Sequence, residues 1–345
     1  MAKVGIADVA QAAGVSEATV SRVINNRGTV AAGTRKAVEA ALRTVGYART
    51  NVSNVVLLVT PGLDEPFFAR TSERIMSALG MHGLRGVVCS APVGGTQELD
   101  LVSAMVDAGI VATIFVSASN TLEGADPGVH RLLTREHIPF VCINGAFDQA
   151  DAPVLSTNDA LASQLAVEHL WGLGHRRIGL IAGPTGNRPS DRRVAGFRET
   201  MAALGAGTGD GTGDGTVDAA VYAPVVRIAY SMEGGVSAAT TLLGAAEPPT
   251  AIIAASDEMA LGAIRAARRA GLSIPGDLSV VGYDDALPLD FVDPPLTSVR
   301  QPVDRLAAAV APIVLAQVRG RHPDATELMF DPELIVRAST APAPR

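Results

Sequence analysis

The stretch that decides the fold is GIADVAQAAGVSEATVSRVINN, residues 5–26. Apolar residues recur at helical spacing in its first half, Gly14 interrupts the pattern, and Ser16 can cap a second helix that turns Val20 and Val23 inward. Two short helices joined by a tight turn form a helix-turn-helix, whose second helix can enter the major groove of DNA. The pattern therefore predicts a DNA-binding headpiece.

A third helix is predicted after the loop at Asn25, Asn26 and Gly28. Its apolar side would be formed by Val38, Ala41, Leu42 and Val45, and Gly46 would close it. Three helices of this size can share one small core, so we expect the headpiece to comprise residues 1–47.

The second helix exposes short polar side chains and one arginine. Hydroxyl groups at a helix N-terminus suit phosphate oxygens, and an arginine can bond both acceptors on a guanine edge. A capped helix with an ordinary solvated face is the structural alternative, and for Arg22 alone it would be the better choice. The predicted exposed positions are Ser16, Glu17, Ala18, Thr19, Ser21 and Arg22.

Charge is unevenly distributed along the chain. Residues 1–50 hold seven Lys and Arg against three Asp and Glu, a formal charge of +4, whereas the whole chain carries −7, so the remainder carries −11. A basic head on an acidic body fits a module that attracts phosphate and a partner domain that avoids nonspecific contact with nucleic acid.

From about residue 55 the pattern changes to short β-branched runs alternating with amphipathic stretches. Repeated strand–helix units of this kind predict doubly wound parallel sheets, and aromatic residues make up only 4% of the chain, which suits aliphatic cores between helices and sheets. The runs interpreted as strands are NVVLLVT, GVVCS, VATIFVS, IPFVCIN, RIGLIAG, AAVYAP, TAIIAA and LSVVGY. The Gly-, Thr- and Asp-rich segment 205–220 is interpreted as a flexible surface loop.

An interruption of the strand series near 151–160 and a Pro-rich passage near 288–302 predict two lobes connected by several crossings. We expect an α/β sensor over residues 55–345, joined to the headpiece by a short linker at 48–54. The N-lobe is predicted to comprise about 55–154 and 286–320, and the C-lobe about 155–285 and 321–345.

The composition argues against several classes of protein. No apolar run reaches the roughly 18 residues that a membrane span needs, and the N-terminus lacks the pattern of a signal peptide, so we expect a cytoplasmic protein that does not enter a membrane. The two cysteines lie in apolar runs and are interpreted as buried thiols. The histidines show no ligand spacing, and no nucleophile or phosphate loop stands out, so we expect no metal, no cofactor and no enzyme activity.

A series of motifs runs almost end to end through the rest of the chain. They are PGLDEPFF (61–68), HLWGLGHRRIGLIAGP (169–184), RRVAGF (192–197), ASDEMALGAIRAARRAGLSIPGDLSVVGYDD (255–285), PPLTSVRQP (294–302) and ELIVRAST (333–340). Together with the headpiece, they resemble the lactose/galactose repressor (LacI/GalR) family of bacterial regulators. The resemblance implies a sequence-specific transcriptional regulator, expected to be a repressor, with a periplasmic-binding-protein-like sensor. It also implies a homodimer that binds double-stranded operator DNA under the control of a small-molecule effector, a sugar or related metabolite.

The resemblance assigns roles within the headpiece. Glu17, Ala18 and Arg22 match positions where the family contacts bases. Ser16, Thr19, Ser21 and Asn25 match positions that hold the DNA backbone. Ala18 can offer only apolar contact, and Glu17 prefers a cytosine amino group, so we expect an operator unlike those of members with longer side chains there.

The resemblance also assigns effector contacts in the sensor. Ligands of open α/β sheets bind beyond the carboxyl ends of strands, and polyols are held by charged bidentate groups and aromatic faces. Structural alternatives are an aromatic pair that packs the first sensor helix, for Phe67 and Phe68, and a turn-capping role for Asp284. The predicted effector-binding residues are Phe67, Phe68, Asn144, Arg193, Tyr230, Asp257 and Asp284.

The sequence departs from the family pattern at positions that bear on the effector. Asn144 and Gly145 stand where the family usually has an aspartate and an arginine, ATIF (112–115) replaces an aspartate-glycine pair, and Ser256 replaces an asparagine. We therefore expect an effector that is less hydroxylated or differently charged than a typical hexose.

The linker departs from the family pattern as well. ARTNVSNV (48–55) is about half the usual length and lacks the leucine that the family inserts into the minor groove. Eight residues span about 26 Å extended but only about 12 Å as a helix. We predict an extended linker, weak DNA bending and weakened operator binding. Partial unwinding of the neighbouring helix or strand, which would restore a hinge, stays open, as does a solute-binding protein without a DNA role.

Overall fold

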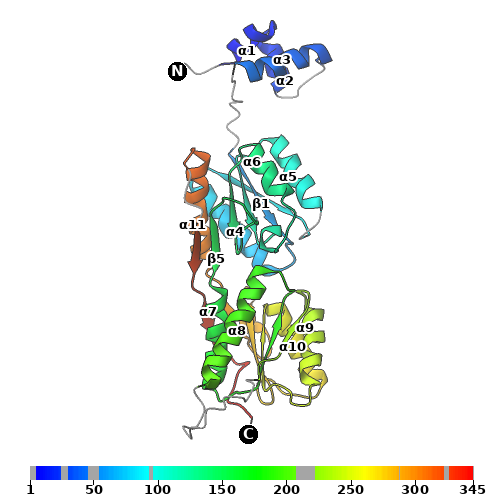
Figure 1. The fold of residues 1–345 in the computed structure, drawn as a ribbon, viewed down its shortest axis with the longest axis vertical. Coiled ribbons are helices and arrows are strands. Elements are labelled where there is room, and N and C mark those ends of the chain that lie inside the picture. Colours follow the sequence, from blue (N-terminus) through cyan, green and yellow to red (C-terminus); the bar gives the residue numbers. More distant parts are fainter. Residues whose placement is uncertain are drawn as a thin grey trace. The chain divides into compact units, whose positions relative to one another are not determined.

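The computed structural model describes residues 5–24, 30–45, 54–92, 96–206, 222–286, 288–321 and 326–344. The chain forms two compact units, Met1–Ser53 and Asn54–Arg345. The predicted linker at 48–53, Asn25 and most of the predicted loop at 205–220 lie outside the described residues. In its described residues the first unit contains helices only, and the second is an α/β structure (Figure 1).

The first unit contains helices α1 (Ile6–Ala13), α2 (Glu17–Ile24) and α3 (Ala32–Thr44). Gly14 ends α1 in the left-handed conformation, with a φ of 64°, which glycine adopts without a steric penalty. Ser16 begins α2 because its Oγ accepts a hydrogen bond from the Thr19 amide at 3.2 Å. The helix-turn-helix predicted from the sequence is confirmed.

The core of the first unit is a small aliphatic cluster to which all three helices contribute. Its buried members are Val9, Ala10, Val20, Val23, Val38 and Ala41. Val9, Val20 and Val38 are fully buried, one from each helix. The spacing of apolar residues in the sequence thus identified the inward faces of these helices correctly.

The N-lobe of the second unit is built on a six-stranded sheet in the order β11-β5-β4-β3-β1-β2. All neighbouring strands in it run parallel. Its strands are β1 (Val55–Thr60), β2 (Arg85–Ser90), β3 (Ala112–Val116), β4 (Phe140–Ile143), β5 (Val154–Thr157) and β11 (Glu327–Phe330). Its helices are α4 (Pro66–Met81), α5 (Thr96–Ala108), α6 (Gly128–Arg135) and α11 (Val303–Val318), with the short 3-10 helix η1 (Ser119–Thr121). Helix α6 was not predicted.

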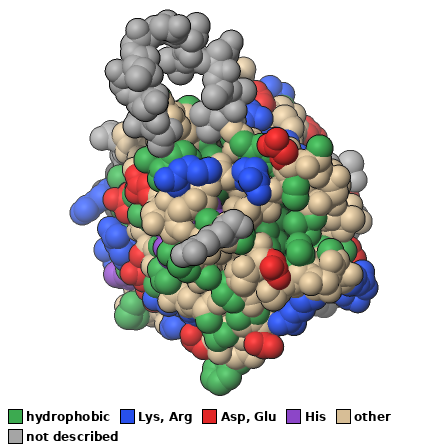
Figure 2. Space-filling model, turned by 90° about the horizontal axis from the view of Figure 1, so that it is seen from below, with side chains coloured by type: hydrophobic (Ala, Val, Ile, Leu, Met, Phe, Trp, Pro, Cys, Tyr) green, Lys and Arg blue, Asp and Glu red, His purple; other side chains and the backbone are tan. Residues whose placement is uncertain are grey.

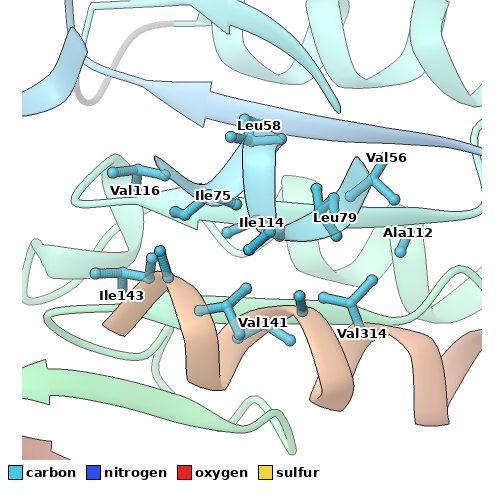
Figure 3. Close-up of a cluster of buried hydrophobic side chains, with 14 of the residues drawn as sticks. Val56, Leu58, Ile75, Leu79, Ala112, Ile114, Val116, Val141, Ile143 and Val314 are labelled. Carbon is cyan, nitrogen blue, oxygen red and sulfur yellow. The ribbon is translucent and has the colours of Figure 1, made fainter. Parts of the chain in front are cut away.

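One side of this sheet is closed by α4 and α11, which pack against each other. Alternate residues of β1, β3 and β4 point toward these helices and meet Ile75, Leu79 and Val314 (Figure 3). Burial on both faces explains why the strands read as unbroken β-branched runs. Of the two cysteines, both free, Cys142 is buried within β4 and Cys89 is half-buried in β2.

The C-lobe is built on a second six-stranded sheet in the order β12-β10-β9-β8-β6-β7. Its strands are β6 (Ile178–Ala182), β7 (Val225–Arg227), β8 (Ala251–Ala254), β9 (Ser279–Asp284), β10 (Thr297–Arg300) and β12 (Glu333–Ile335). Only β12 is antiparallel. The helices are α7 (Asp159–Gly172), α8 (Arg188–Ala206), α9 (Met232–Leu243) and α10 (Asp257–Arg269), with the 3-10 helix η2 (Leu289–Phe291). Strand β7 is VVR at 225–227; of the strand AAVYAP expected at 219–224, residues 222–224 are not in a strand and 219–221 lie outside the described residues.

The predicted lobe boundaries need correction in the C-terminal part of the chain. Strand β10 pairs in parallel with β9, so the chain enters the N-lobe after Arg300 and not near residue 286. Strand β11 pairs with β5, so residues 327–330 belong to the N-lobe sheet and not to the C-lobe. The Pro-rich passage resembled a crossing, but it leads into another strand of the same sheet. The chain crosses between the lobes near residues 158, 301 and 331.

Within the described parts of the chain, no helix is both long and apolar enough to cross a membrane. Figure 2 shows one face of the molecule from below, on which basic, acidic and apolar side chains are interspersed. Because charges of both signs alternate on that face, it lacks the extended basic surface that attracts nucleic acid.

Candidate functional site

Helix α2 presents the candidate DNA-contacting residues of the first unit. Glu17, Ala18 and Arg22 are exposed, whereas Val20 and Val23 are buried on the opposite side. The hydroxyls of Ser16 and Thr19 hydrogen-bond each other at 2.9 Å, which fixes both at the helix N-terminus. All the predicted DNA-contacting residues that the structure describes thus lie together on this helix and at its N-terminus. Of the predicted DNA contacts, Asn25 lies outside the described residues.

The second unit contains a cavity of about 310 Å³ between its lobes. It lies at the carboxyl ends of strands from both sheets, where ligands of open α/β sheets bind. Its lining residues are Pro61, Gly62, Asp64, Glu65, Phe67, Phe68, Ser117, Asn144, Asn187, Pro189, Arg193, Tyr230, Ala255, Glu258, Asp284 and Gln301. Six of the seven predicted effector residues are among them.

Arg193 is held rigidly at the floor of this cavity. It lies on α8 and is buried, its Nε donates to Asp159 Oδ1 at 2.8 Å, and an η nitrogen donates to the carbonyl of Ala255. Its guanidinium stacks on the ring of Tyr283, 3.9 Å from the ring centroid. Burial and several fixed partners leave Arg193 little freedom, so it can present its remaining N–H groups to a ligand without losing conformational entropy.

Asp284 ends β9 and faces the cavity from the C-lobe. Its φ of 104° is one that L residues rarely adopt. Its Oδ1 accepts a hydrogen bond from Gln301 Nε2 at 2.7 Å. Burial raises the pKa of Asp284 well above its usual value, and the nearby carboxylates of Asp257 and Glu65 act in the same direction.

The aromatic residues form two parts of the wall. Phe67 and Phe68 begin α4 with their ring centroids 5.4 Å apart in an edge-to-face arrangement. Phe67 is buried, Phe68 is half-buried and packs on the N-lobe core, and both also line the cavity. The pair therefore combines the structural role and the lining role that the sequence left open. Tyr230 faces them from the loop after β7, and its buried hydroxyl lies near Ser190 without a well-formed hydrogen bond.

Asn144 lies after β4 in the left-handed conformation, with a φ of 65°. Its Nδ2 donates to Ser117 Oγ at 3.0 Å, and its Oδ1 accepts from the Thr157 amide at 3.2 Å. Its carboxamide therefore ties together the ends of three neighbouring strands, and it lines the cavity as predicted.

Asp257 is not part of the cavity lining. It starts α10, accepts hydrogen bonds from Ser298 Oγ at 2.6 Å and from the Ala286 amide at 3.1 Å, and is buried beneath the site. Burial raises its pKa to about 7, opposed by the hydrogen bond from Ser298. Its place after a strand gave it the appearance of a ligand residue, but the structure gives it a supporting role for the 284–286 turn.

Sequence reasoning missed an acidic group at the cavity. Asp64 and Glu65 precede α4 in the N-lobe, and Glu258 lies in the first turn of α10 in the C-lobe. Burial raises the pKa of Glu65 to about 7, and the charge of Glu258 adds to the effect. The motif PGLDEPFF contained the first two residues, but only the fold reveals that they face Glu258 of the other lobe.

Gln301 was also missed, although it lies within the motif PPLTSVRQP. It is buried in the crossing between β10 and α11 and lines the cavity. Nothing in the sequence showed that this glutamine is in contact with Asp284. Among the described residues, no group of His, Cys, Asp and Glu side chains has the arrangement of a metal site.

Comparison with known proteins matches a known type of domain to each of the two sites. Residues 5–50 match the family model described as bacterial regulatory proteins, lacI family, and residues 167–340 match a periplasmic binding protein-like domain. Over 98% of its length the chain is 42% identical to the HTH-type transcriptional regulator MalR of Streptomyces coelicolor, of which it covers 97%. The chain belongs to the LacI family.

Solved structures extend this relationship to the fold. A complex described as transcriptional regulator CelR with cellobiose aligns with a TM-score of 0.72 and 28% identity, over 97% of this chain and 99% of that one. The lac repressor dimer bound to operator and the anti-inducer ONPF aligns with a TM-score of 0.70 and 26% identity, over 99% and 100%. This LacI-family chain is therefore a transcriptional regulator with a helix-turn-helix unit and a two-lobed sensor unit.

Proposed function

We propose that this regulator is a homodimeric repressor of the cytoplasm that reads a near-palindromic operator and responds to an uncharged, hydroxyl-bearing effector of the sugar class. One recognition helix contacts few phosphates, and a symmetric dimer doubles that contact. The dimeric lac repressor structure and the cellobiose complex of CelR, both relatives in fold, support the two halves of the proposal.

The charge of the cavity is the observation that carries the effector class. Asp64, Glu65, Glu258 and Asp284 all line it, and among its described lining residues Arg193 is the one basic side chain. That guanidinium already neutralises Asp159. A phosphorylated metabolite would add negative charge to a site whose burial already disfavours ionised carboxyl groups, whereas sugar hydroxyls can hydrogen-bond with these groups in either protonation state.

The test compares neutral and phosphorylated versions of the same sugars. Calorimetry with ribose, glucose and cellobiose against ribose 5-phosphate and glucose 6-phosphate should show binding by members of the neutral set. The phosphorylated partner of a binder should bind at least roughly 10-fold more weakly, because a like charge would be buried. Glu65→Gln should narrow that gap, and Glu123→Gln, at an exposed site outside the cavity lining, should leave it unchanged. Tighter binding of a phosphorylated sugar would overturn the proposed class.

Two other functions are less well supported. A free solute-binding protein has no use for the three-helix unit at residues 5–45. An enzyme that used Asp284 and Asp285 as acid and base would need both carboxylates in one site, but they point to different partners. Asp284 bonds Gln301, whereas Asp285 accepts from Arg300 at 2.7 Å and from Arg337 at 2.8 Å. We therefore infer that the protein binds its effector without converting it.

A further inference from the structure

Gln301 occupies a position that belongs to both lobes. It directly follows β10 of the C-lobe sheet and is two residues before α11, which packs on the N-lobe sheet. Its side chain is buried and lines the cavity beside Asp284. A buried carboxamide has to satisfy both its acceptor and its donors, so its partners define its orientation.

Those partners lie in different lobes. Gln301 Oε1 accepts from the hydroxyl of Thr157, the last residue of β5 in the N-lobe sheet, at 2.6 Å. Gln301 Nε2 donates to Asp284 Oδ1, at the end of β9 in the C-lobe sheet, at 2.7 Å. The carboxamide nitrogen thus faces Asp284 and the oxygen faces Thr157, an orientation that favours the ionised form of Asp284, because an ionised carboxylate can only accept. One side chain thus spans the two sheets.

The hydrogen bonds continue into the N-lobe. The amide of Thr157 donates to Asn144 Oδ1 at 3.2 Å, and Asn144 Nδ2 donates to Ser117 Oγ at 3.0 Å. A backbone N–H can only donate, so the Asn144 carboxamide is oriented as firmly as that of Gln301. The series Ser117, Asn144, Thr157, Gln301 and Asp284 therefore runs without a break along the cavity floor, and four of its five members line the cavity.

This series fixes the position of Asp284 relative to the opposite lobe. Gln301 donates to Oδ1 of Asp284, and among the described residues no hydrogen bond reaches Oδ2. If the lobes shift relative to each other, Thr157 and Asp284 shift too, and the short bonds of Gln301 must lengthen or re-form. The carboxylate that receives the effector is thereby linked to the geometry between the lobes.

We propose that Gln301 is a positioning residue that holds Asp284 in its effector-binding orientation and links that orientation to the N-lobe through Thr157. Only the part of this inference that concerns effector binding rests on the proposed function. The bonds to Thr157 and Asp284 exist whatever the effector is, so they can be tested without it.

The variants separate the two bonds of Gln301. Gln301→Met removes both, whereas Thr157→Val removes the bond to Thr157 and leaves the donor to Asp284 in place. Gln317→Met is the matched control, because Gln317 is a half-buried glutamine of α11 whose Nε2 donates to the Phe140 carbonyl at 3.4 Å, far from the cavity lining. Each change is made in the full chain and in the Asp284→Asn background.

The first readout is the pH dependence of the unfolding free energy between pH 5 and pH 9. Gln301 donates to the ionised form of Asp284 and lowers its pKa against the effect of burial, so its loss matters most where Asp284 is ionised. The deficit of Gln301→Met should grow as pH rises, and this growth should vanish in the Asp284→Asn background, whereas the deficit of Thr157→Val should change little with pH. Charged and titratable groups that face Asp284 are common to all variants, namely Glu65, Arg193, Tyr230, Asp257 and Tyr283.

The second readout is affinity for ribose and cellobiose. Gln301→Met should weaken binding of either sugar that the unaltered chain binds by roughly 10-fold or more, since a ligand would have to reorient Asp284. Gln317→Met should not. If neither sugar binds the unaltered chain, the support for a neutral-sugar effector is lost, while the pH measurement still decides the role of Gln301. A deficit that does not change with pH, or a growth with pH that persists in the Asp284→Asn background, would overturn the positioning role.

Discussion

Arg193 on α8 and Asp159 at the start of α7 form a buried ion pair, with Nε and Oδ1 2.8 Å apart. The Tyr283 hydroxyl donates to the same oxygen of Asp159 at 2.7 Å. Arg193 lines the cavity and Asp159 does not, so the pair connects the effector site to the packing of the C-lobe.

Removing the arginine should therefore destabilise the sensor as well as impair effector binding. Arg193→Ala leaves Asp159 buried without a counter-charge, and we expect the free energy of unfolding to fall by about 3–5 kcal/mol. Urea denaturation measures it. Arg188→Ala is the matched control on the same helix, because Arg188 pairs with the half-exposed Asp148. That change should cost less than about 1 kcal/mol. Equal costs would show that Asp159 does not depend on Arg193.

Asp284→Ala tests the effector site directly. Sugar hydroxyls would be left unpaired in the closed cavity, so effector affinity should fall roughly 10-fold or more by calorimetry. Operator affinity without effector should be unchanged. Asp107→Ala, at an exposed position of α5, is the control. Unchanged effector affinity in Asp284→Ala would show that the cavity has been misassigned.

Buried histidine should make the sensor less stable in acid. His175 Nδ1 lies 2.9 Å from Thr250 Oγ1, and Nε2 lies 3.0 Å from the Ala341 carbonyl. Burial lowers its pKa, and the charges of His169 and Arg176 add to this effect, so the unfolded chain binds the extra proton more readily. The stability that His175 contributes is present above its unfolded pKa of about 6.5 and is lost as pH falls below it.

The measurement is the difference in unfolding free energy between the unaltered chain and His175→Asn from pH 7.5 to pH 5. We expect that difference to shrink as pH falls. Taking a difference removes the opposite contribution of Glu65 and Asp257, whose raised pKa values favour the folded state in acid. A constant difference would mean that His175 does not titrate in this range.

The sequence was most informative at positions where the local conformation strongly favours one type of residue. Gly14 at a left-handed turn and Ser16 at a helix start gave the headpiece, and the β-branched runs gave the buried strands. Arg193 and Asp284 were assigned through the family resemblance of RRVAGF and of the motif that ends in VVGYDD, and both line the cavity. Other predictions depended on distant contacts: Asp257, like Asp284, lies near the carboxyl end of a strand, yet its carboxylate bonds Ser298 and the 284–286 turn and does not line the cavity.

The lobe boundaries and the acidic group failed for a related reason. The strand runs predicted from the sequence did not include β10 or β11, and only pairing with β9 and β5 shows which sheet each of these strands joins. The proximity of Glu65 to Glu258 likewise depends on how the two lobes face each other, and Gln301 gained its role from Thr157, 144 residues away in the chain.

The linker at 48–54 stays a prediction from sequence, since 48–53 lie outside the described residues. A segment this short cannot form a two-turn helix and still connect both ends, and Val52 is a small wedge for unstacking bases. We expect little DNA bending by the full-length dimer. Inserting a typical family hinge between Arg49 and Asn51 should tighten operator binding and strengthen the effector response. A pronounced central kink with the unaltered chain would refute this prediction.

The central claim is that this chain is a sequence-specific regulator whose α2 helix reads DNA, and selection of binding sites from random double-stranded DNA tests it most directly. The full-length protein should enrich a near-palindromic site. On that site Arg22→Ala should cost about 1–3 kcal/mol and relax the preference at one base pair per half-site, with far less effect on random DNA. No enriched site, or equal loss by Arg22→Ala on selected and random DNA, would contradict the account.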